Sequence, residues 1–302
     1  MDHKKQHFVP ATYLRAWCDT RSPAMCKPSY VWVFPKNGGE AKNRPPEKIF
    51  WGPNFYTIKG SDGKRDLIIE ESLAQLESQF TIMRKRTLSK RKPLSSQEKN
   101  VLCTFVAAMF ARTKSQRDHI RRQGQELLDI GNRMAKWAEN AIPGERKQLS
   151  MSFGPHQEPS FSLDDVKNIV ENPMPSYLGT TVDPITTALC KMRFAILCSS
   201  DTSTFITSDT PCVWFDADLF QNPSPFGAGG LISPSIEISL PLSPTQYIIF
   251  GRKLIFDGLY ISIKADNPLI ETINRRTWEN TDEYFIANEN SKNFSWLSQK
   301  RD

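Results

Sequence analysis

The chain has 302 residues, of which 39% are hydrophobic and 24% are charged, and its formal net charge is +6. This hydrophobic content is enough to bury a core, so the composition excludes an intrinsically disordered chain. The mean hydropathy is −0.46 and no run of about 18 apolar residues occurs, so we expect no membrane-spanning helix and no membrane partner. The N-terminal residues lack the apolar segment of a signal peptide, which predicts a cytoplasmic protein.

The first half of the chain is predicted to be mainly helical. A short helix is expected from Pro10, because proline is favoured in the first turn of a helix. Two β-like runs separated by turns follow within residues 30–60. Apolar residues then recur at helical spacing over residues 65–142, and Ser95 and Glu98 have the spacing of a capping box.

The second half is predicted to form a sheet. Polar, turn-forming residues at 146–162 indicate a loop, and two short helices are expected around 164–172 and 184–192. Short apolar runs with turns between them then fill residues 192–263, and a last helix leads into a strand-like FIAN.

This order of elements predicts an α+β fold in which a helical N-terminal half packs on a mixed or antiparallel sheet from the C-terminal half. We expect one composite domain over residues 1–302, helix-rich over 1–145, with the polar loop 146–162, and sheet-rich over 163–302.

The positive charge is concentrated in one stretch. Between Arg84 and Arg122 there are twelve Lys or Arg and only two acids, a local balance of +10, so the rest of the chain carries −4. Such a stretch can attract phosphate backbones, although a charge run is also typical of a solvated helix face and its loop. If nucleic acid is the partner, the expected contacts come from the turn after the first long helix, at Lys85, Arg86, Lys90 and Arg91.

Strong catalytic motifs are absent. The sequence has no GxxxxGK[ST], GxSxG, HExxH or CxxC, nor a GxGxxG after a strand, which argues against P-loop ATPases, α/β-hydrolases, zincins, zinc ribbons and Rossmann enzymes. A weaker candidate is the run ITSDTP, where Ser208 and Asp209 end an apolar strand. A carboxylate there can bind a metal or act as a base, and Ser-Asp before Thr-Pro equally suits a turn.

Further candidates lie on the predicted helices. Glu70 and Glu77 are seven residues apart and share a helix face, and Arg112 falls near the apolar side of its helix, where it could pair with a carboxylate or clamp a phosphate. His7 precedes the first helix and is a candidate functional histidine. Asn274 lies in the body of an apolar helix, so its amide needs a partner, either a neighbouring loop or a ligand.

These pieces occur together in a recognisable order. HFVPATYLRAW, NFY, IEESLAQLE, VAAMFART, ITSDTP, LPLSP and INRRT follow one another along the chain, and the set resembles the bacterial family of domains of unknown function DUF4238 over roughly residues 5 to 290. The resemblance implies pattern residues at His7, Pro10, Tyr13, Leu14, Glu70, Glu77, Arg112, Ser208, Asp209, Pro211, Pro241, Leu242, Pro244 and Asn274. It implies a shared site, not a reaction.

The polar members of that pattern come from every part of the chain, so they form either a buried structural network or one site. As a site they suit a metal-assisted phosphodiesterase. Asp209, Glu70 and Glu77 would hold a divalent ion, Mg²⁺ or Mn²⁺, His7 would activate water, and Arg112 would stabilise the developing charge. Ser208 and Asn274 would then contact the substrate.

Three functions follow from this inventory. The first is a nuclease-like hydrolase that cleaves RNA or DNA, as in a toxin or a phage-defence effector, with the stretch 84–122 bringing in the nucleic acid. The alternative is a non-catalytic nucleic-acid-binding or sensing module. The third is a hydrolase or transferase that acts on a small phosphorylated metabolite.

Overall fold

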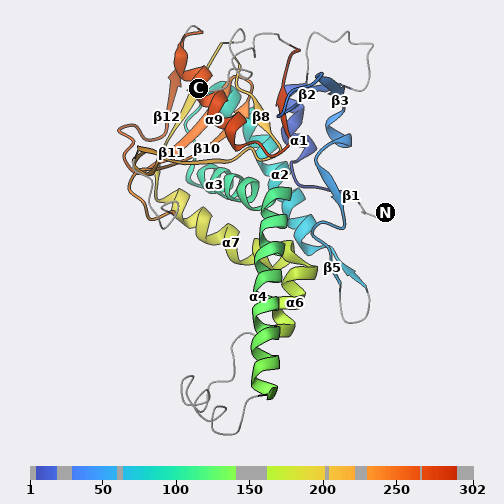
Figure 1. Cartoon of the computed structure of the whole chain (residues 1–302). Coiled ribbons are helices and arrows are strands. Elements are labelled where there is room, and N and C mark those ends of the chain that lie inside the picture. Colours follow the sequence, from blue (N-terminus) through green and yellow to red (C-terminus); the bar gives the residue numbers. More distant parts are fainter. Residues whose placement is uncertain are drawn as a thin grey trace.

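The computed structural model describes residues 5–18, 29–59, 64–140, 162–200, 204–221, 230–265 and 267–290 (Figure 1). The polar stretch predicted at 146–162 lies outside these residues except for its last position. The helices are α1 (Ala11–Leu14), η1 (Arg15–Trp17), η2 (Pro46–Lys48), α2 (Ile68–Arg86), η3 (Leu88–Lys90), α3 (Ser96–Ala111), α4 (Lys114–Asn140), α6 (Leu163–Glu171), α7 (Pro173–Cys190), α8 (Ala217–Gln221) and α9 (Pro268–Asn280).

The strands form two main sheets and two short pairs. The large sheet has the order β12-β7-β11-β10-β9, the second has β3-β2-β13-β8, and β1 pairs with β4 and β5 with β6. The strands are β1 (Lys5–His7), β2 (Val31–Pro35), β3 (Lys42–Arg44), β4 (Trp51–Pro53), β5 (Ile58–Lys59), β6 (Arg65–Asp66), β7 (Arg193–Cys198), β8 (Thr207–Ser208), β9 (Val213–Asp216), β10 (Ile236–Ser243), β11 (Gln246–Gly251), β12 (Leu259–Ser262) and β13 (Tyr284–Ala287).

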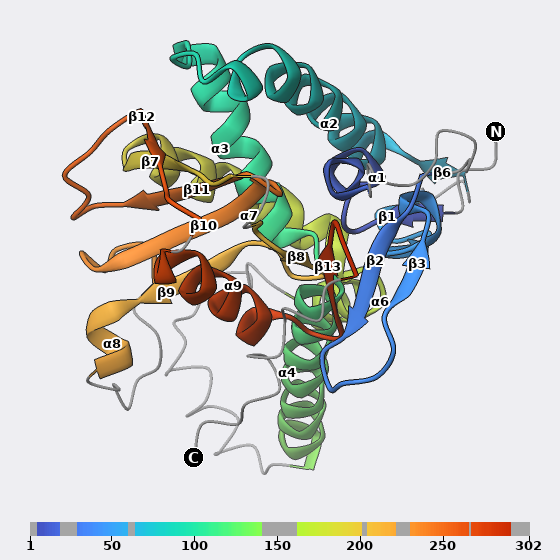
Figure 2. The same cartoon turned by 90° about the horizontal axis from the view of Figure 1, so that it is seen from above.

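The large sheet is covered on both faces (Figure 2). Side chains alternate along a strand, and on β7 Phe194 and Ile196 join the main core with α3 and α7, whereas Leu197 packs on the opposite face. There it meets Ile270 and Ile273 of α9. The result is three layers, α9, sheet and α3–α7, which explains why these strands read as nearly continuous apolar runs.

The second sheet joins distant parts of the chain. Its strand β2 pairs with β13 in antiparallel register, with Val33 opposite Ile286 and Phe34 opposite Phe285. The Val33 and Ile286 face belongs to the main core, and the phenylalanine face packs near Trp278 of α9. Helix α9 therefore contacts both sheets and fixes how they meet.

The N-terminal segment lies between the helices and the strands. The hydroxyl of Tyr13 on α1 donates to the carbonyl oxygen of Pro241 at 2.7 Å and shares a hydrogen bond with Thr207. The indole of Trp17 donates to the carbonyl oxygen of Phe205 at 2.9 Å. Both aromatic side chains are fully buried, so this short segment ties the two halves together.

The α+β prediction is confirmed, with most helices in the first half and the large sheet in the second. The capping box at Ser95 is also confirmed, since its hydroxyl accepts from the Glu98 amide while the Glu98 carboxylate accepts from the Ser95 amide. The helix expected from residue 184 is longer than predicted: α7 begins at Pro173 and holds Pro184 inside it. Among the described helices, none is long and apolar enough to cross a membrane.

Candidate functional site

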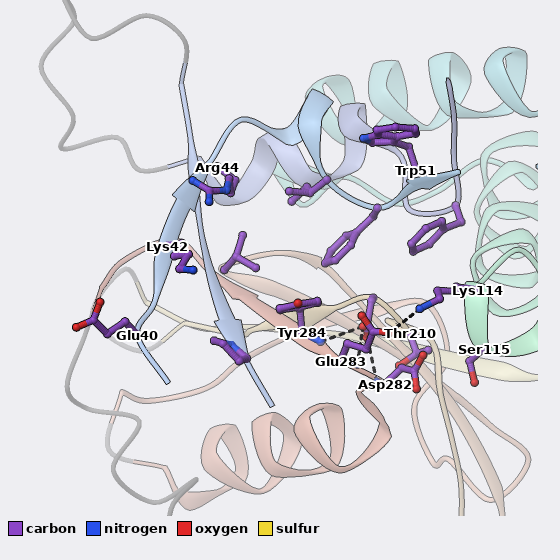
Figure 3. A pocket seen from close by; sticks show the side chains of 16 residues that line it. Glu40, Lys42, Arg44, Trp51, Lys114, Ser115, Thr210, Asp282, Glu283 and Tyr284 are labelled. Carbon is purple, nitrogen blue, oxygen red and sulfur yellow. Dashed lines mark hydrogen bonds and ion pairs between the residues drawn. The ribbon is translucent and has the colours of Figure 1, made fainter. Parts of the chain in front are cut away.

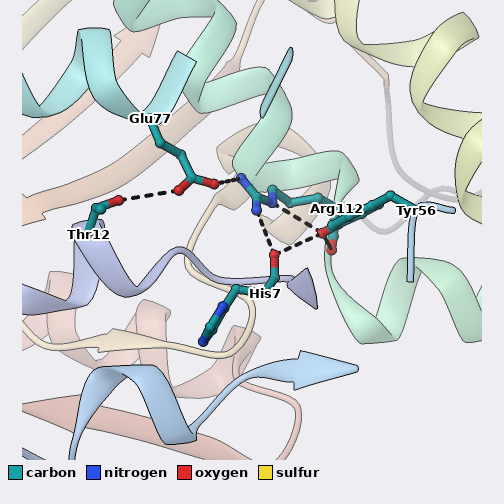
Figure 4. Close-up of polar contacts among 5 residues, drawn as sticks. All are labelled: His7, Thr12, Tyr56, Glu77 and Arg112. Atoms are coloured by element: carbon teal, nitrogen blue, oxygen red, sulfur yellow. Dashed lines mark hydrogen bonds and ion pairs between the residues drawn. The ribbon is translucent and has the colours of Figure 1, made fainter. Parts of the chain in front are cut away.

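A buried arginine connects three of the predicted site segments (Figure 4). Arg112 is the C-cap of α3 and is 2% exposed. Its Nη1 pairs with Glu77 Oε1 at 2.8 Å, its Nη2 donates to the main-chain oxygen of His7 at 2.6 Å, and its Nε donates to the Tyr56 hydroxyl at 3.2 Å. Burial lowers the pKa of Arg112, but the interactions with Tyr56 and Glu77 outweigh burial and raise it, so the guanidinium stays charged.

The second carboxylate of this region is held by a residue that the sequence did not single out. Gln6, only 1% exposed, donates to Glu70 Oε2 at 2.7 Å and to the Thr57 hydroxyl at 3.0 Å. The side-chain oxygen of Gln6, Oε1, accepts from the main-chain amide of Tyr56 at 2.6 Å. Gln6 has no local signal in the sequence, whereas Tyr56 belongs to the NFY that contributed to the family resemblance.

Together these residues line a cavity of about 100 Å³, formed by Lys5, Gln6, His7, Tyr56, Glu70, Leu73, Ala74, Glu77 and Arg112. The structure therefore brings together four of the predicted residues: His7, Glu70, Glu77 and Arg112. Small-molecule sites usually measure about 300–1,000 Å³, so this cavity suits water or one small ion and is too small for a nucleotide.

His7 takes part through its backbone. Its ring points away from Glu77 and Arg112, while its carbonyl oxygen faces them (Figure 4). The imidazole Nε2 is buried and has no hydrogen-bond partner among the described residues. Burial lowers the pKa of His7, so the ring is neutral at pH 7. The predicted activation of water would need the ring to turn toward Glu77.

Asp209 lies in a different place. Its Oδ1 accepts from the Asp282 amide at 2.9 Å, and its Oδ2 accepts from the amides of Glu283 and Tyr284 at 2.7 and 2.9 Å. Burial raises the pKa of Asp209, and the three amides oppose that rise. Both carboxylate oxygens thus hold the turn between α9 and β13, which is a distant turn and not the local Ser-Asp turn considered from the sequence.

Ser208 and Asn274 also engage the backbone. The Ser208 hydroxyl, fully buried, accepts from the Thr210 amide at 3.1 Å. The Asn274 side chain accepts from the Ile206 amide at 3.0 Å and donates to the Thr204 carbonyl oxygen at 2.9 Å. Of the two roles considered for Asn274, the geometry is that of a side chain that fixes a neighbouring segment.

The expected metal ligands are divided by this arrangement. Glu70 and Glu77 line the small cavity beside Arg112, whereas Asp209 lines a separate, larger cavity between β2, β3 and β13. Within the described parts of the chain, no group of three or more His, Cys, Asp and Glu side chains is arranged to hold a metal ion. The three carboxylates therefore do not form one ligand set.

The basic stretch is likewise divided, because α3 runs through its middle. Residues 84–92 precede α3 and residues 112–122 follow it. A helix of 16 residues is about 24 Å long, so the two groups of cations sit at opposite ends of it. The sequence count of +10 describes two surfaces, not one patch.

The two groups also differ in their partners. After α3, Arg112 pairs with Glu77, Lys114 with Glu283 and Arg117 with Asp118, and Arg121 donates to a backbone oxygen; of this group only Arg122 makes no ion pair or hydrogen bond with a described residue. Before α3, four exposed side chains make no ion pair with any described residue, namely Lys85, Arg86, Lys90 and Lys92. We call residues 84–92 the basic face.

A hollow of about 400 Å³ lies beside the basic face. Its lining has three cations, four other polar side chains and no carboxylate: Ala16, Arg84, Lys85, Ser89, Arg91, Ser243, Thr245 and Gln246. The Arg84 guanidinium is fixed there by bonds to the carbonyl oxygens of Thr12 and Tyr13, and Arg91 donates to the Ser262 hydroxyl at 3.1 Å.

Comparison with known proteins gives one match. The model of a family described as protein of unknown function (DUF4238) matches residues 5–291, almost the span predicted from the ordered motifs. No curated protein and no solved structure matches the chain.

Proposed function

The chain belongs to the DUF4238 family of proteins of unknown function, and from that premise we propose that it binds nucleic acid through its basic face. The family description assigns no activity, so the proposal rests on the geometry of this chain. It takes up the non-catalytic alternative raised by the sequence.

The observation that carries the proposal is the absence of ion-pair partners at Lys85, Arg86, Lys90 and Lys92 within the described structure. Cations that already have carboxylate partners gain little from a phosphate, because they must give up one partner for another. Unpaired, exposed cations instead release condensed counterions from the phosphate backbone when they bind it.

The hollow beside the basic face supports the same function. Hydroxyls contact phosphate and sugar oxygens in nucleic-acid complexes, and Ser89, Ser243 and Thr245 supply these groups next to Arg84 and Lys85. No carboxylate lines the hollow to repel a phosphate. These contacts read backbone and not bases, so we expect weak sequence preference.

The test is fluorescence anisotropy with a labelled single-stranded RNA or DNA oligonucleotide of mixed sequence at 50–200 mM NaCl. Each phosphate contact to a single strand contributes about 0.7 to the slope of log affinity against log salt. The double variant Lys85→Gln with Arg91→Gln loses two such contacts, so the magnitude of the slope should decrease by about 1.4. Across this fourfold range of salt, the variant should lose about sevenfold less affinity than the wild type.

The matched control is Arg133→Gln with Lys136→Gln, which removes one Arg and one Lys from the exposed surface of α4. It changes the net charge equally and should leave the slope unchanged. Equal effects of the two double variants would show that binding follows net charge alone, and absence of binding by the wild type at 50 mM NaCl would overturn the proposal.

Cleavage by a metal ion held in the 100 Å³ cavity is a second candidate function, because two carboxylates and an arginine line the cavity and only the ion would have to fit inside it. It would have to proceed without Asp209, which lies elsewhere. The same oligonucleotides, incubated with Mg²⁺ or Mn²⁺, should be cleaved by the wild type and not by Glu70→Gln. Intact oligonucleotide in every sample would leave binding as the function.

A further inference from the structure

Another cavity, separate from the hollow at the basic face and from the Arg112 cavity, lies beside the second sheet. It has a volume of about 510 Å³, within the usual size range of small-molecule sites, and it opens between β2, β3 and β13 on one side and residues 49–51 on the other (Figure 3). None of the functions considered above uses it as a binding site, although Asp209 lies in its wall.

The register of the second sheet directs two cations toward this cavity. Lys42 is opposite Val33, and Arg44 is opposite Val31, in the β2–β3 pair. Opposed residues of antiparallel strands project to the same face of a sheet. Val31 and Val33 are buried in the main core, so the cations lie on the same face of the sheet as these valines; both cations are exposed, and both line the cavity.

Neither cation is neutralised. Lys42 and Arg44 make no ion pair with a described residue, and the one hydrogen bond of the Arg44 side chain goes to the neighbouring carbonyl oxygen of Asn43. Two cations at alternate positions of one strand can contact the same phosphate group, which carries up to two negative charges.

The middle of the cavity is aromatic. Trp51 comes from the segment after η2 and Tyr284 from β13 (Figure 3), and Phe50 also lines the cavity. The Lys5 ammonium lies 4.7 Å from the centre of the Trp51 ring, which orients that ring. Tyr284 is 38% exposed, so part of its ring is open to the cavity that it lines.

The wall opposite the cations is acidic. Glu283 lies there, already paired with Lys114 at 2.5 Å, and Asp282 has no side-chain partner among the residues described. Carboxylates are good acceptors for the hydroxyls of a sugar or for an exocyclic amino group. The cavity thus has two cations and the carboxylate of Glu40 at one end, aromatic rings in the middle, and two acids with Lys114 at the other end (Figure 3).

We propose that this cavity binds a nucleoside monophosphate. Its phosphate lies at Lys42 and Arg44, its base packs against Trp51 and Tyr284, and its ribose hydroxyls or amino groups face Asp282. A simple anion would use only the cationic end, and an apolar ligand only the middle. Inward-facing charges also protect an edge strand from pairing with another chain, and the experiment separates that role from ligand binding.

The experiment is isothermal titration calorimetry on the full chain at constant ionic strength. The titrants are AMP, GMP, CMP and UMP, the four parent nucleosides, and inorganic phosphate. We expect at least one monophosphate to bind with 1:1 stoichiometry, about tenfold or more tightly than its nucleoside or phosphate alone, because only the complete ligand reaches both ends of the cavity.

Three variants assign the site. Lys42→Gln with Arg44→Gln should weaken the monophosphate about tenfold or more and leave the nucleoside unchanged. Trp51→Leu should weaken nucleoside and monophosphate alike, and Trp51→Phe should restore most of the affinity. Lys85→Gln with Arg91→Gln, on the basic face, should have no effect, so this proposal and the proposed function fail independently.

Two results would overturn the proposal. One is the absence of a binding isotherm with all four monophosphates at millimolar concentration. The other is a monophosphate affinity that stays at the wild-type value in the Lys42 and Arg44 double variant, when this variant also unfolds thermally as the wild type does. The two cations would then serve only to protect the edge strand.

Discussion

Replacing Glu77 by alanine removes the one carboxylate that pairs with Arg112 in the described structure. The side chains of the pair are 3% and 16% exposed, so the guanidinium has almost no access to water while the pair is intact. Breaking a buried pair in this way costs about 3–5 kcal/mol, which is a large part of the roughly 5–15 kcal/mol that stabilises a typical protein.

The structure favours the lower end of that range. Glu77 is partly exposed, so water can reach the site once the carboxylate is gone, and its second bond, from the Thr12 hydroxyl, is long at 3.3 Å. The guanidinium also keeps its bonds to the His7 oxygen and the Tyr56 hydroxyl. We therefore expect Glu77→Ala to lower the free energy of unfolding by about 3 kcal/mol.

The assay is urea unfolding followed by circular dichroism, with Glu77→Gln, Arg112→Met and the double variant completing a cycle. Glu77→Gln keeps an acceptor and should lose less than Glu77→Ala. The double variant Glu77→Ala with Arg112→Met should be about 1–3 kcal/mol more stable than the sum of the two single losses predicts. Glu71→Ala, an exposed acid on the same helix, is the control and should change stability by less than about 0.5 kcal/mol. A loss below that value for Glu77→Ala, or additive losses, would refute the reasoning.

Three further predictions concern Gln6, His7 and Asp209. Gln6→Ala should cost about 1–3 kcal/mol in the same urea assay, because the buried amide of Tyr56 loses its acceptor; stability equal to the wild type would contradict this. The pKa of His7 is lowered by burial, so the unfolded chain binds the proton first, and stability should fall as the pH drops below about 6.5. His7→Gln should flatten that decline in thermal unfolding, and an unchanged slope would show that other groups cause it. Asp209→Asn should cost about 1–3 kcal/mol, since an amide nitrogen would face backbone amides, and should leave nucleic-acid affinity unchanged; loss of affinity with full stability would give Asp209 a direct role.

Local features were predictable from the sequence because neighbours in the chain decide them. The capping box of Ser95 and Glu98 needs only a three-residue spacing, and the apolar run of β7 is enough to predict a buried strand. The residues that the family model matches were also predictable, because the order of several motifs is informative even where no single motif is specific.

The arrangement of the candidate site was not predictable in the same way. Whether Asp209 meets Glu77 depends on the pairing of β2 with β13, which are about 250 residues apart, and no local pattern encodes that pairing. Gln6 is buried in the structure, but its neighbours in the sequence are polar, so nothing in the sequence distinguishes it from a surface glutamine. The local charge of +10 did not show that the cations form two groups, because a count along the sequence ignores the length of α3.

The anchoring of α1 has a consequence during synthesis on the ribosome. The partner of Tyr13 is Thr207, 194 residues later, and that of Trp17 is Phe205, 188 residues later. At about 5–20 residues per second, roughly 10–40 s separate the appearance of these aromatic side chains from that of their partners. During this interval the nascent chain exposes a Tyr–Trp pair that a chaperone can hold, and the order of translation makes the first segment one of the last to settle.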